Sequence, residues 1–527
     1  MGIYLNPGNE NFKRTLSAPI YVDKTDMLRA LNTFIDQGNN YVCVSRPRRF
    51  GKTIAGNMIS AYYSKGCDSK RLFANLKIAL DTRFEERLNR YDVIKIDLNG
   101  EYQTAENKKD TIKRLQHKVK KEFYKEFPNI AFEDDLNLAE MIMTVYQETN
   151  ETFIIIIDEY DILVREQVEK ELFTEYIAFL NGLFKNDTLR PAISLAYITG
   201  ILPVVRDKIQ SKLNNFEEYT ILEAGELAEY VGFTSLEVET LCERYGVDFN
   251  ECRLWYDGYR QHGYEIYNPE SVVKCIRNKA FSGYWGKTSS YKVISDLIIR
   301  DFDGIREDVI SMLAGENVPV NVSSYMNTMT DFSSKSDVFT YLVYVGYLAF
   351  DMDTYTCRIP NKEIRQEWFN VMETEAKYKE TDRIIKASRQ LLEDTINGDE
   401  DAVARALDIS HIHVTSNRSY NNEDALASAI YLAYIYALNE YNVYKELTTG
   451  KGFADVVFVP FREERPAMII ELKHNKSADS ALDQIRQKQY FKSLEHYNGN
   501  LLFVGISYDE KTKKHSCRIE RFVKDVS

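Results

Sequence analysis

Between residues 41 and 200, short runs of β-branched residues alternate with longer segments of helical periodicity. The extended runs cover 41–45, 92–98, 153–158 and 193–199, and helical segments begin near 53, 108 and 168. Strands separated by helices indicate βαβ units and hence a parallel sheet. The consecutive isoleucines of the third run suit a strand that helices cover on both faces. The pattern therefore predicts an N-terminal α/β domain.

The pattern changes twice more toward the C-terminus. Residues 216–345 are mainly helical with aromatic loops, and residues 375–410 are helical and charged. After residue 421 we expect a helix over 423–440, strands over 443–448, 453–459 and 467–473, a helix over 478–496, and strands over 500–506 and 516–522. This αβββαββ order predicts a compact α/β domain with a mixed sheet. The expected parts are 1–215, a helical lid or connector over 216–345, a helical linker region over 346–420, and 421–527.

The composition is that of a globular protein with several domains. At 527 residues the chain is too long for one hydrophobic core, and its net charge of −13 excludes a surface that is basic throughout. Its cysteines contain no CxxC pair and suit a reducing compartment. The N-terminus lacks a signal-peptide pattern, and the apolar stretch 426–438 is too short to span a bilayer. We expect a cytoplasmic protein without a membrane anchor, and the sequence leaves a homo-oligomer open.

A phosphate-binding loop is the first chemical candidate. The strand 41–45 leads into the segment Arg46-Pro47-Arg48-Arg49-Phe50-Gly51-Lys52-Thr53, and a helix follows. In such a loop, backbone N–H groups and the helix N-terminus hold phosphates, Lys52 reaches the β- and γ-oxygens, and the Thr53 hydroxyl binds Mg²⁺. Arg46 stands where the GxxxxGK[ST] pattern has its first glycine. A helix N-cap without a ligand is therefore the alternative.

The strand 153–158 supplies the second half of a nucleotide site. It ends in Asp158 and Glu159, where a Walker B pair belongs. Asp158 would hold Mg²⁺, and Glu159 would orient or polarise the attacking water. The alternative is a strand that ends in two solvated acids. Because the Gly-Lys-Thr segment precedes it, the pair predicts ATP binding and hydrolysis.

Two neighbouring strands near the C-terminus carry a candidate nuclease centre. Asp455 lies on the strand 453–459, and the next strand ends in Glu471, Leu472 and Lys473. Because side chains alternate along a strand, Glu471 and Lys473 point to one face, where Asp455 can meet them. Two acids can hold Mg²⁺ or Mn²⁺ together with the Leu472 carbonyl, and the lysine can position the water that attacks a phosphodiester. Acid and lysine pairs are common in strands, so the surrounding residues decide the matter.

The helix predicted over 478–496 favours the nuclease interpretation. Gln484 and Lys488 share one of its faces at i,i+4 spacing, and Gln484 is a further catalytic candidate. Glu423 and Glu446 are additional acids on the preceding helix and strand. These residues predict a polar helix face that returns to the two acids.

Six short segments together carry a resemblance to a known family. They are Tyr21-Val22-Asp23-Lys24-Thr25, SRPRRFGKT (45–53), IIIIDEYD (154–161), LNN (213–215), WYDGY (255–259) and YNP (267–269), in this order. The chain resembles the predicted AAA-ATPase-like family, whose members often carry a C-terminal PD-(D/E)XK nuclease domain. The spacing of Asp455, Glu471 and Lys473 is similar to the pattern of that nuclease superfamily.

The resemblance implies a P-loop parallel-sheet ATPase of the AAA/STAND type with a helical lid, and a restriction-endonuclease-like αβββαβ domain at the C-terminus. It implies ATP and Mg²⁺ as cofactors, and an arginine at position 46 is typical of the family. The implied nucleotide-binding residues are Arg46, Arg48, Arg49, Phe50, Gly51, Lys52, Thr53, Asp158 and Thr199. Thr199 resembles a sensor residue, and Arg206 or Arg260 is a candidate to sense the γ-phosphate. Relatives place a glutamine like Gln484 beside the metal. Gly452-Phe453 departs from the usual Gly-Arg and puts DNA contact there in doubt.

The combined expectation is an ATP-regulated or ATP-driven nuclease that acts on DNA, in which the nucleotide state controls access to the metal site. One alternative is a nucleotide-dependent switch or scaffold whose degenerate nuclease-like domain binds nucleic acid or protein without cleaving it. Another is an ATPase that recruits partner proteins. That last interpretation leaves Asp455, Glu471 and Lys473 on facing strands without an explanation.

Overall fold

The computed structural model describes residues 2–204, 215–285, 304–324, 332, 334–374, 379–414, 426, 429–431, 433–449, 452–461, 464–490, 494, 497 and 499–522. The chain forms two compact units. Unit 1 comprises Met1–Ile294 and Asn317–Arg365, and unit 2 comprises Ser295–Glu316 and Gln366–Ser527. The division into four parts stays a prediction.

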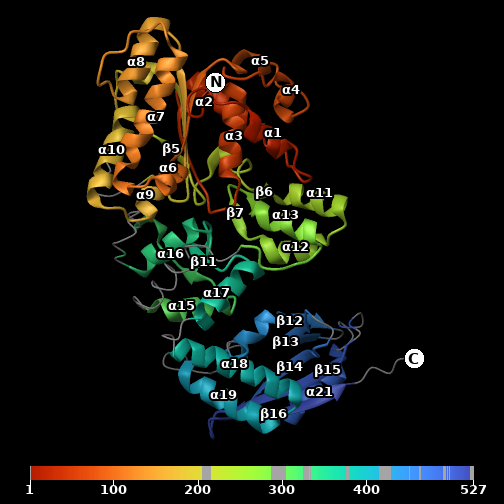
Figure 1. The fold of residues 1–527 in the computed structure, drawn as a ribbon. Helices are drawn as coiled ribbons and strands as arrows, with labels where there is room; N and C mark the ends of the chain where they lie inside the picture. Colours follow the sequence, from red (N-terminus) through yellow and green to blue (C-terminus); the bar gives the residue numbers. More distant parts are fainter. Residues whose placement is uncertain are drawn as a thin grey trace. The chain divides into compact units, whose positions relative to one another are not determined.

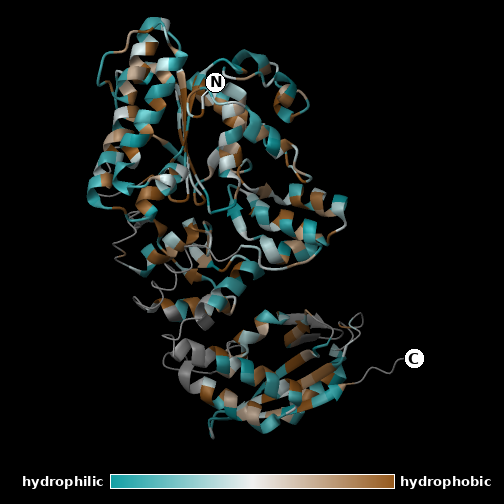
Figure 2. Ribbon diagram, in the orientation of Figure 1, coloured by the Kyte–Doolittle hydropathy of each residue, from teal (hydrophilic) through white to brown (hydrophobic). Residues whose placement is uncertain are grey.

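Unit 1 is built on a five-stranded sheet in the order β2-β3-β4-β1-β5. The strands are β1 (Tyr41–Ser45), β2 (Asp92–Asp97), β3 (Phe153–Asp158), β4 (Ile193–Gly200) and β5 (Glu217–Tyr219). All four neighbouring pairs are parallel, which confirms the predicted parallel sheet. Figure 2 shows hydrophobic residues along these strands.

Helices cover both faces of this sheet because β3 is apolar on both sides. Ile155 and Ile157 belong to the core that includes residues of α7 (Thr111–Glu126), α8 (Leu138–Thr149) and α10 (Lys170–Phe184). Ile156 instead lies against α3 (Lys52–Tyr63) at Gly56. The same alternation places Asp158 on the α3 face. Figure 1 shows α3 on one side of the strands and the α7, α8 and α10 group on the other.

The helix α7 shows how the sequence specifies this layer. Ile112, Leu115, Val119 and Phe123 recur at intervals of three and four residues, are fully buried, and form the apolar stripe of an otherwise charged helix. Phe123 stacks on Phe153 of β3, with ring centroids 5.8 Å apart. The stripe therefore fixes α7 to the sheet.

The other elements of unit 1 are mostly short. They are α1 (Glu10–Leu16), α2 (Met27–Gln37), α4 (Lys70–Phe73), α5 (Phe84–Arg87), α6 (Leu98–Thr104), α9 (Ile162–Arg165), α11 (Ser235–Tyr245), α12 (Phe249–Tyr256), α13 (Pro269–Asn278), α16 (Lys335–Tyr344), α17 (Lys362–Thr374, which extends into unit 2), β6 (Phe233–Thr234), β7 (Tyr259–Gln261), β8 (Tyr264–Tyr267), β9 (Val318–Pro319), β10 (Ala349–Asp351) and β11 (Thr356–Arg358). The helices α11, α12 and α13 share a small core of their own.

Unit 2 contains a second five-stranded sheet in the order β12-β13-β14-β15-β16. Its strands are β12 (Tyr441–Thr449), β13 (Gly452–Pro460), β14 (Ala467–His474), β15 (Leu501–Asp509) and β16 (Lys514–Phe522). Only β14 and β15 pair in parallel, and the other neighbours are antiparallel. This result confirms the predicted mixed sheet. Of the helix predicted over 423–440, residues 423–425, 427–428 and 432 lie outside the described residues, and Ile435–Asn439 form a 3-10 helix.

One helix, α21 (Ala478–Lys488), packs on β14 and β15 through Ala481, Leu482 and Ile485. A close approach is possible because β15 has a glycine at position 505: a Cβ there would stand 2.4 Å from the Ala478 carbonyl oxygen. Gly505 pairs with Glu471 across the sheet. The glycine thus lets α21 descend beside Glu471.

Two further helices, α18 (Lys379–Asn397) and α19 (Glu400–Val414), belong to the same unit, together with α15 (Ile305–Leu313). Glu400 accepts hydrogen bonds from the Arg518 guanidinium at 2.6 Å and from the Ile519 backbone at 2.8 Å. Asp408 accepts one from the His515 backbone at 2.8 Å. Three contacts on β16 therefore fasten α19 to the sheet.

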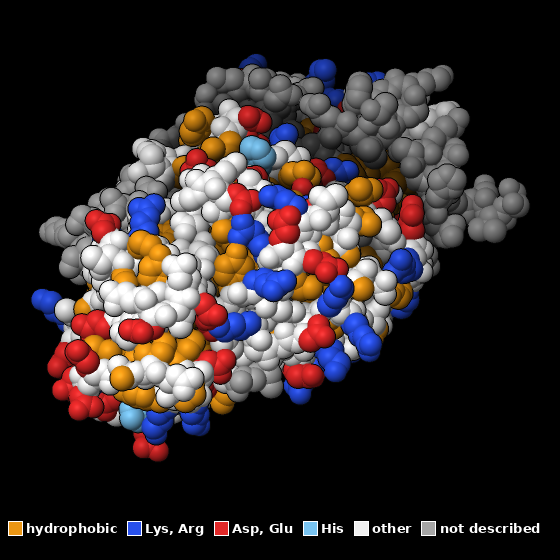
Figure 3. Space-filling model, turned by 90° about the horizontal axis from the view of Figure 1, so that it is seen from above, with side chains coloured by type: hydrophobic (Ala, Val, Ile, Leu, Met, Phe, Trp, Pro, Cys, Tyr) orange, Lys and Arg blue, Asp and Glu red, His pale blue; other side chains and the backbone are white. Residues whose placement is uncertain are grey.

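Charges of both signs are mixed on the surface that Figure 3 shows, where Lys and Arg side chains alternate with Asp and Glu side chains. The described part of that face carries no continuous basic patch. Among the described residues, no helix is both long and apolar enough to cross a lipid bilayer.

Candidate functional site

The loop after β1 folds around the ammonium of Lys52. Gly51 has a φ of 93° and starts α3, so the chain turns there in a way that favours glycine. The Lys52 Nζ donates hydrogen bonds to the carbonyl oxygens of Arg46 at 2.8 Å and Pro47 at 2.9 Å. Burial lowers the pKa of Lys52 to about 8, and Asp158 opposes this shift. The hydrogen-bond partners of the Lys52 ammonium are two neutral carbonyls, and an anionic phosphate would form stronger hydrogen bonds with it.

Arg46 supports the phosphate-binding loop from inside the protein core. Its side chain is fully buried and donates from Nη1 to the carbonyl oxygens of Ser45 at 2.9 Å and Tyr219 at 2.7 Å. It thereby joins the loop to β5, and burial lowers its pKa to about 10. Arg46 does not line the cavity described below. Its side chain occupies the core instead of approaching a ligand.

Arg48, Arg49 and Phe50 all line the cavity described below, and the last two also hold the loop in place. Arg48 lines the cavity, and burial lowers the pKa of its guanidinium, with Arg165 nearby as a further cause. Arg49 donates to the Tyr284 carbonyl at 2.6 Å and pairs with Glu270 at 3.3 Å. Phe50 is buried and meets Tyr259 edge-on at 5.5 Å. Phe50 therefore ties the loop to the WYDGY segment.

The acids at the end of β3 have separate partners. Asp158 is buried and accepts a hydrogen bond of 2.6 Å from the Thr199 hydroxyl on β4. Thr199 reaches it because β4 lies between β1 and β3. The neutral hydroxyl leaves the negative charge of Asp158 available to a cation, and Thr53 lies exposed in the cavity wall. Asp158 and Thr53 are the oxygen ligands that Mg²⁺ prefers.

Glu159 is held by an arginine that the sequence patterns did not reveal. Arg165 of α9 pairs with Glu159 at 2.7 Å and with Asp161 at 3.1 Å, and its side chain is 7% exposed. Asp161 in turn accepts the backbone N–H groups of Ile201 and Leu202 at 2.9 and 2.8 Å. Glu159 itself has a φ of 52°, a strained conformation for a residue other than glycine.

Residues 48–53, Glu159 and Arg165 border a cavity of about 980 Å³ within unit 1, and Asp158 is not among the residues that line it. That volume is at the upper end of the range of small-molecule sites. Its charged lining consists of Lys24, Arg48, Arg49, Lys52, Arg165, Glu159, Glu166 and Glu270, and apolar residues such as Phe12, Ile20, Val22, Met58 and Phe233 line it as well. An anion with an apolar portion fits such a lining, and a nucleoside triphosphate has both features.

In unit 2, the register of β13 and β14 brings the predicted acids together. Val456 faces Ile470, so Asp455 stands beside Glu471. Asp455 Oδ2 accepts the backbone N–H of Leu472 at 2.7 Å. Lys473 Nζ donates to Glu471 Oε1 at 3.1 Å and to the Leu472 carbonyl at 2.9 Å. The predicted acid, acid and lysine thus form one cluster.

The Glu471 carboxyl is buried and only half satisfied. Its Oε1 accepts from both Lys473 and the Gln484 side chain on α21, whereas its Oε2 has no hydrogen-bond partner among the described residues. Burial, followed by repulsion from Asp455, raises the pKa of Glu471 to about 7. A divalent cation between the two acids would remove this penalty. The unsatisfied oxygen therefore fits a metal site.

Two family models match the chain. The family model described as Predicted AAA-ATPase matches residues 8–210, and the model of the PD-(D/E)XK nuclease superfamily matches residues 421–517. A predicted AAA-ATPase domain therefore lies in the N-terminal half of the chain and a PD-(D/E)XK nuclease superfamily domain in the C-terminal half, called below the AAA-ATPase half and the PD-(D/E)XK half. The AAA-ATPase match contains the large cavity's phosphate loop and Asp158, and the PD-(D/E)XK match contains Asp455, Glu471, Lys473 and Gln484.

Individual relatives are more distant. An uncharacterized protein in the vnfD 5′ region of Azotobacter chroococcum mcd 1 is 25% identical over 289 residues, which is 53% of this chain and 52% of that protein. The chain thus spans about half the length of this curated relative. The ORC2 protein of Aeropyrum pernix aligns with 68% of this chain and 98% of its own, at 12% identity and a TM-score of 0.32.

One predicted residue lies outside the large cavity, and others lie outside the described residues. Arg260 is 61% exposed, pairs with Asp353 at 3.7 Å and does not line the cavity. Arg206 and Glu423 lie outside the described residues, as does the side chain of Glu446. Arg165 was missed, although its place four residues after Asp161 permits a pair on one helical turn.

Proposed function

We propose that the AAA-ATPase half binds and hydrolyses ATP with Mg²⁺. The observation that carries this proposal is the basic lining of the large cavity around Lys52, next to the Asp158–Thr199 pair. Lys52 would exchange its loop carbonyls for the β- and γ-phosphate oxygens. Thr53 and Asp158 would hold the metal ion, which neutralises charge on the phosphates when it is bound.

In this proposal, Glu159 orients the attacking water, and Arg165 controls when it can. In the structure, Arg165 occupies one Glu159 carboxylate oxygen from inside the cavity. A terminal phosphate near Lys52 would compete for the arginine, because Arg pairs strongly with phosphate oxygens. Release of Glu159 would then follow nucleotide binding. This assignment makes Arg165, rather than Arg206 or Arg260, the cation that senses the γ-phosphate.

We propose further that the C-terminal half cleaves DNA phosphodiesters in the presence of Mg²⁺ or Mn²⁺. Asp455, Glu471 and the Leu472 carbonyl would hold the metal, which activates a water when it is bound. Lys473 would give up the Leu472 carbonyl and help to place that water. Gln484 keeps the Glu471 side chain in position from α21. The nucleotide state of the first half would control this activity.

A specific observation favours the alternative of a switch whose nuclease-like half only binds. Lys473 and Gln484 both already donate hydrogen bonds to the same oxygen of Glu471. These two donors compensate part of the Glu471 charge without a metal. Gly452-Phe453, in place of the usual Gly-Arg, favours the same alternative.

The test is incubation of the full chain with linear, circular, single-stranded and double-stranded DNA, with and without Mn²⁺ and ATP. Cleavage that requires Mn²⁺ and changes with ATP supports the proposal. Tight DNA binding without cleavage in every condition supports the switch.

We place the protein in the cytoplasm, since all seven cysteines are free thiols, as a reducing compartment would leave them.

A further inference from the structure

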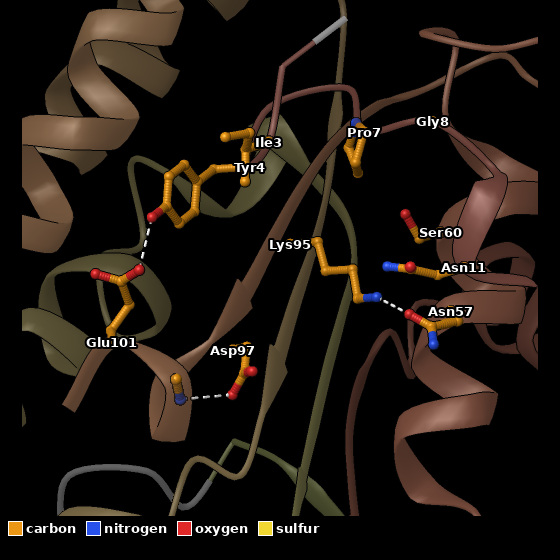
Figure 4. Close-up of a pocket in the computed structure, with 11 residues that line it drawn as sticks. Ile3, Tyr4, Pro7, Gly8, Asn11, Asn57, Ser60, Lys95, Asp97 and Glu101 are labelled. Atoms are coloured by element: carbon orange, nitrogen blue, oxygen red, sulfur yellow. Dashed lines mark hydrogen bonds between the residues drawn. The ribbon is translucent and has the colours of Figure 1, made fainter. Parts of the chain in front are cut away.

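A second, smaller cavity lies in the AAA-ATPase half, on the α3 face of the β2 edge strand. Its volume is about 240 Å³, and Ile3, Asn11, Asn57, Ser60, Lys95 and Asp97 are among its lining residues. Figure 4 shows side chains from α1, α3 and β2 that point toward one another there. The volume greatly exceeds the ~10–15 Å³ that a single water needs and is below that of most drug-sized sites.

Lys95 provides a positive charge at this cavity. Its position on β2 pairs with Ile156 of β3, so its side chain points to the α3 face. The Lys95 ammonium donates to the side-chain oxygen of Asn57 on α3, and within the described part of the chain it forms no ion pair. Burial lowers the pKa of this lysine. A half-buried ammonium whose partner is a neutral amide gains from a ligand with negative charge.

Three uncharged donors surround the ammonium. The hydroxyl of Ser60, one turn after Asn57 on α3, is 2% exposed and has no hydrogen-bond partner among the described residues. Because Asn57 accepts from Lys95 with its oxygen, its NH₂ group is left to donate. The Asn11 amide enters from α1, as Figure 4 shows. An unpaired buried hydroxyl costs free energy, which a ligand oxygen would recover.

The acids at this cavity are engaged elsewhere. Glu101 accepts from the Tyr4 hydroxyl at 2.6 Å and from Lys118 at 2.7 Å. Asp97 accepts the Gly100 N–H at 2.9 Å and caps α6, and its side chain is turned away from Lys95 in Figure 4. The charges of Asp158 and Asp97 still act on the Lys95 ammonium and oppose the fall in its pKa. The side chains that can donate a hydrogen bond next to Lys95 are nevertheless those of Asn57, Ser60 and Asn11.

We infer that this cavity binds a small oxyanion, specifically a phosphate group, on Lys95, Asn57, Ser60 and Asn11. Four donors from three elements match the several acceptor oxygens of a phosphate. The group can come from inorganic phosphate or from a small phosphate monoester. This site is separate from the proposed ATP site, because none of the four residues lines the large cavity.

The experiment must separate this site from the phosphate loop. Inorganic phosphate and glycerol phosphate are each titrated by calorimetry, at constant ionic strength, into the full chain carrying Lys52→Ala, which removes the anchor of the loop. Binding should persist in that variant. Adding Ser60→Ala should weaken it by at least roughly tenfold, the effect of losing one hydrogen bond to a charged ligand. Adding Lys95→Met should abolish it.

Lys70→Met is the matched control, because Lys70 is an exposed lysine of the same unit that pairs with Glu85. It should leave the affinity unchanged. If Lys95→Met lowers the melting temperature, Ser60→Ala and Asn11→Leu decide, since Asn11 is exposed and neither change removes a charge. Equal phosphate affinity in Lys52→Ala with and without Ser60→Ala and Asn11→Leu would overturn the inference. Tighter binding of the ester than of phosphate identifies a metabolite as the source.

Discussion

The two candidate catalytic centres have opposite charge balances. The large cavity of the AAA-ATPase half has five basic and three acidic side chains in its lining, whereas the PD-(D/E)XK cluster has two acids and one lysine. The first therefore attracts an anion and the second a cation. The charge of each centre is thus opposite to that of its proposed ligand, which is a nucleotide in one half and a divalent metal in the other.

The centres also differ in how the acids are restrained. Asp158 and Glu159 have separate partners, a hydroxyl and a guanidinium, on different elements. Asp455 and Glu471 instead lie side by side, and one oxygen of Glu471 has no partner among the described residues. In the first arrangement each acid has a hydrogen-bond partner or an ion pair of its own. The second stores a local electrostatic cost that only a proton or a metal removes.

The largest expected effect concerns the acid pair. Asp455→Ala removes one of two metal-binding acids, so Mn²⁺-dependent DNA cleavage should fall by at least about 10³-fold, roughly 4 kcal/mol. ATP binding should be unchanged, because Asp455 does not line the ATP cavity. Cleavage is measured on the DNA that wild type cuts best. Asp483→Ala is the control, since Asp483 is an exposed acid of α21 paired with Arg486. Undiminished cleavage in Asp455→Ala excludes the acid pair as the metal site.

The next effect concerns the phosphate loop. Lys52→Ala should weaken ATP binding by roughly 100-fold, because several charge-assisted hydrogen bonds to phosphate are lost. Fluorescence titration with a labelled nucleotide measures it, and Lys70→Ala is a control for removal of a lysine charge. Unchanged affinity in Lys52→Ala would mean that the nucleotide does not sit on this loop.

A smaller effect should separate Arg165 from Glu159. Glu159→Gln should leave ATP affinity near that of wild type and stop turnover, whereas Arg165→Ala should weaken affinity and lower kcat, each by about tenfold. Steady-state hydrolysis together with nucleotide titration distinguishes the two. Arg260→Ala is the control, because that arginine is exposed outside the cavity. A larger loss in Arg260→Ala than in Arg165→Ala would return the sensing role to the arginine named by the sequence.

The sequence predicted the two sheets because each rests on local patterns. The strand β3 is a nearly continuous apolar run, and β14 begins with four apolar residues. The alternation of side chains alone places Glu471 and Lys473 of β14 on one face. Arg165 could not be found in this way, since its contact with Glu159 depends on a strained turn after β3. The packing of α19 on β16 depends on pairs more than 100 residues apart, such as Arg518 with Glu400. Periodicity carries no information about such pairs.

The smallest expected effect is a dependence of metal affinity on pH. Burial raises the pKa of Glu471 to about 7, and the metal needs the ionised carboxylate. Between pH 8 and pH 6 the ionised fraction falls about tenfold, so Mn²⁺ affinity should fall by about the same factor. Without metal the sign for stability is the reverse of the usual acid case. The folded state binds the proton more tightly than the unfolded chain, so this group's contribution is present at low pH and is lost as pH rises through 7.

Calorimetric titration with Mn²⁺ at pH 6, 7 and 8 measures this dependence. Repeating the pH 6 titration in two buffers of different ionisation enthalpy should show release of close to one proton for each ion bound. Lys473→Met should shift the dependence toward higher pH, because the lysine favours the ionised form of Glu471. Equal Mn²⁺ affinity at all three pH values, with no proton release, would mean that the ion does not displace the Glu471 proton. The acid pair would then not be a cation site, and the contrast in charge with the large cavity would have no functional meaning.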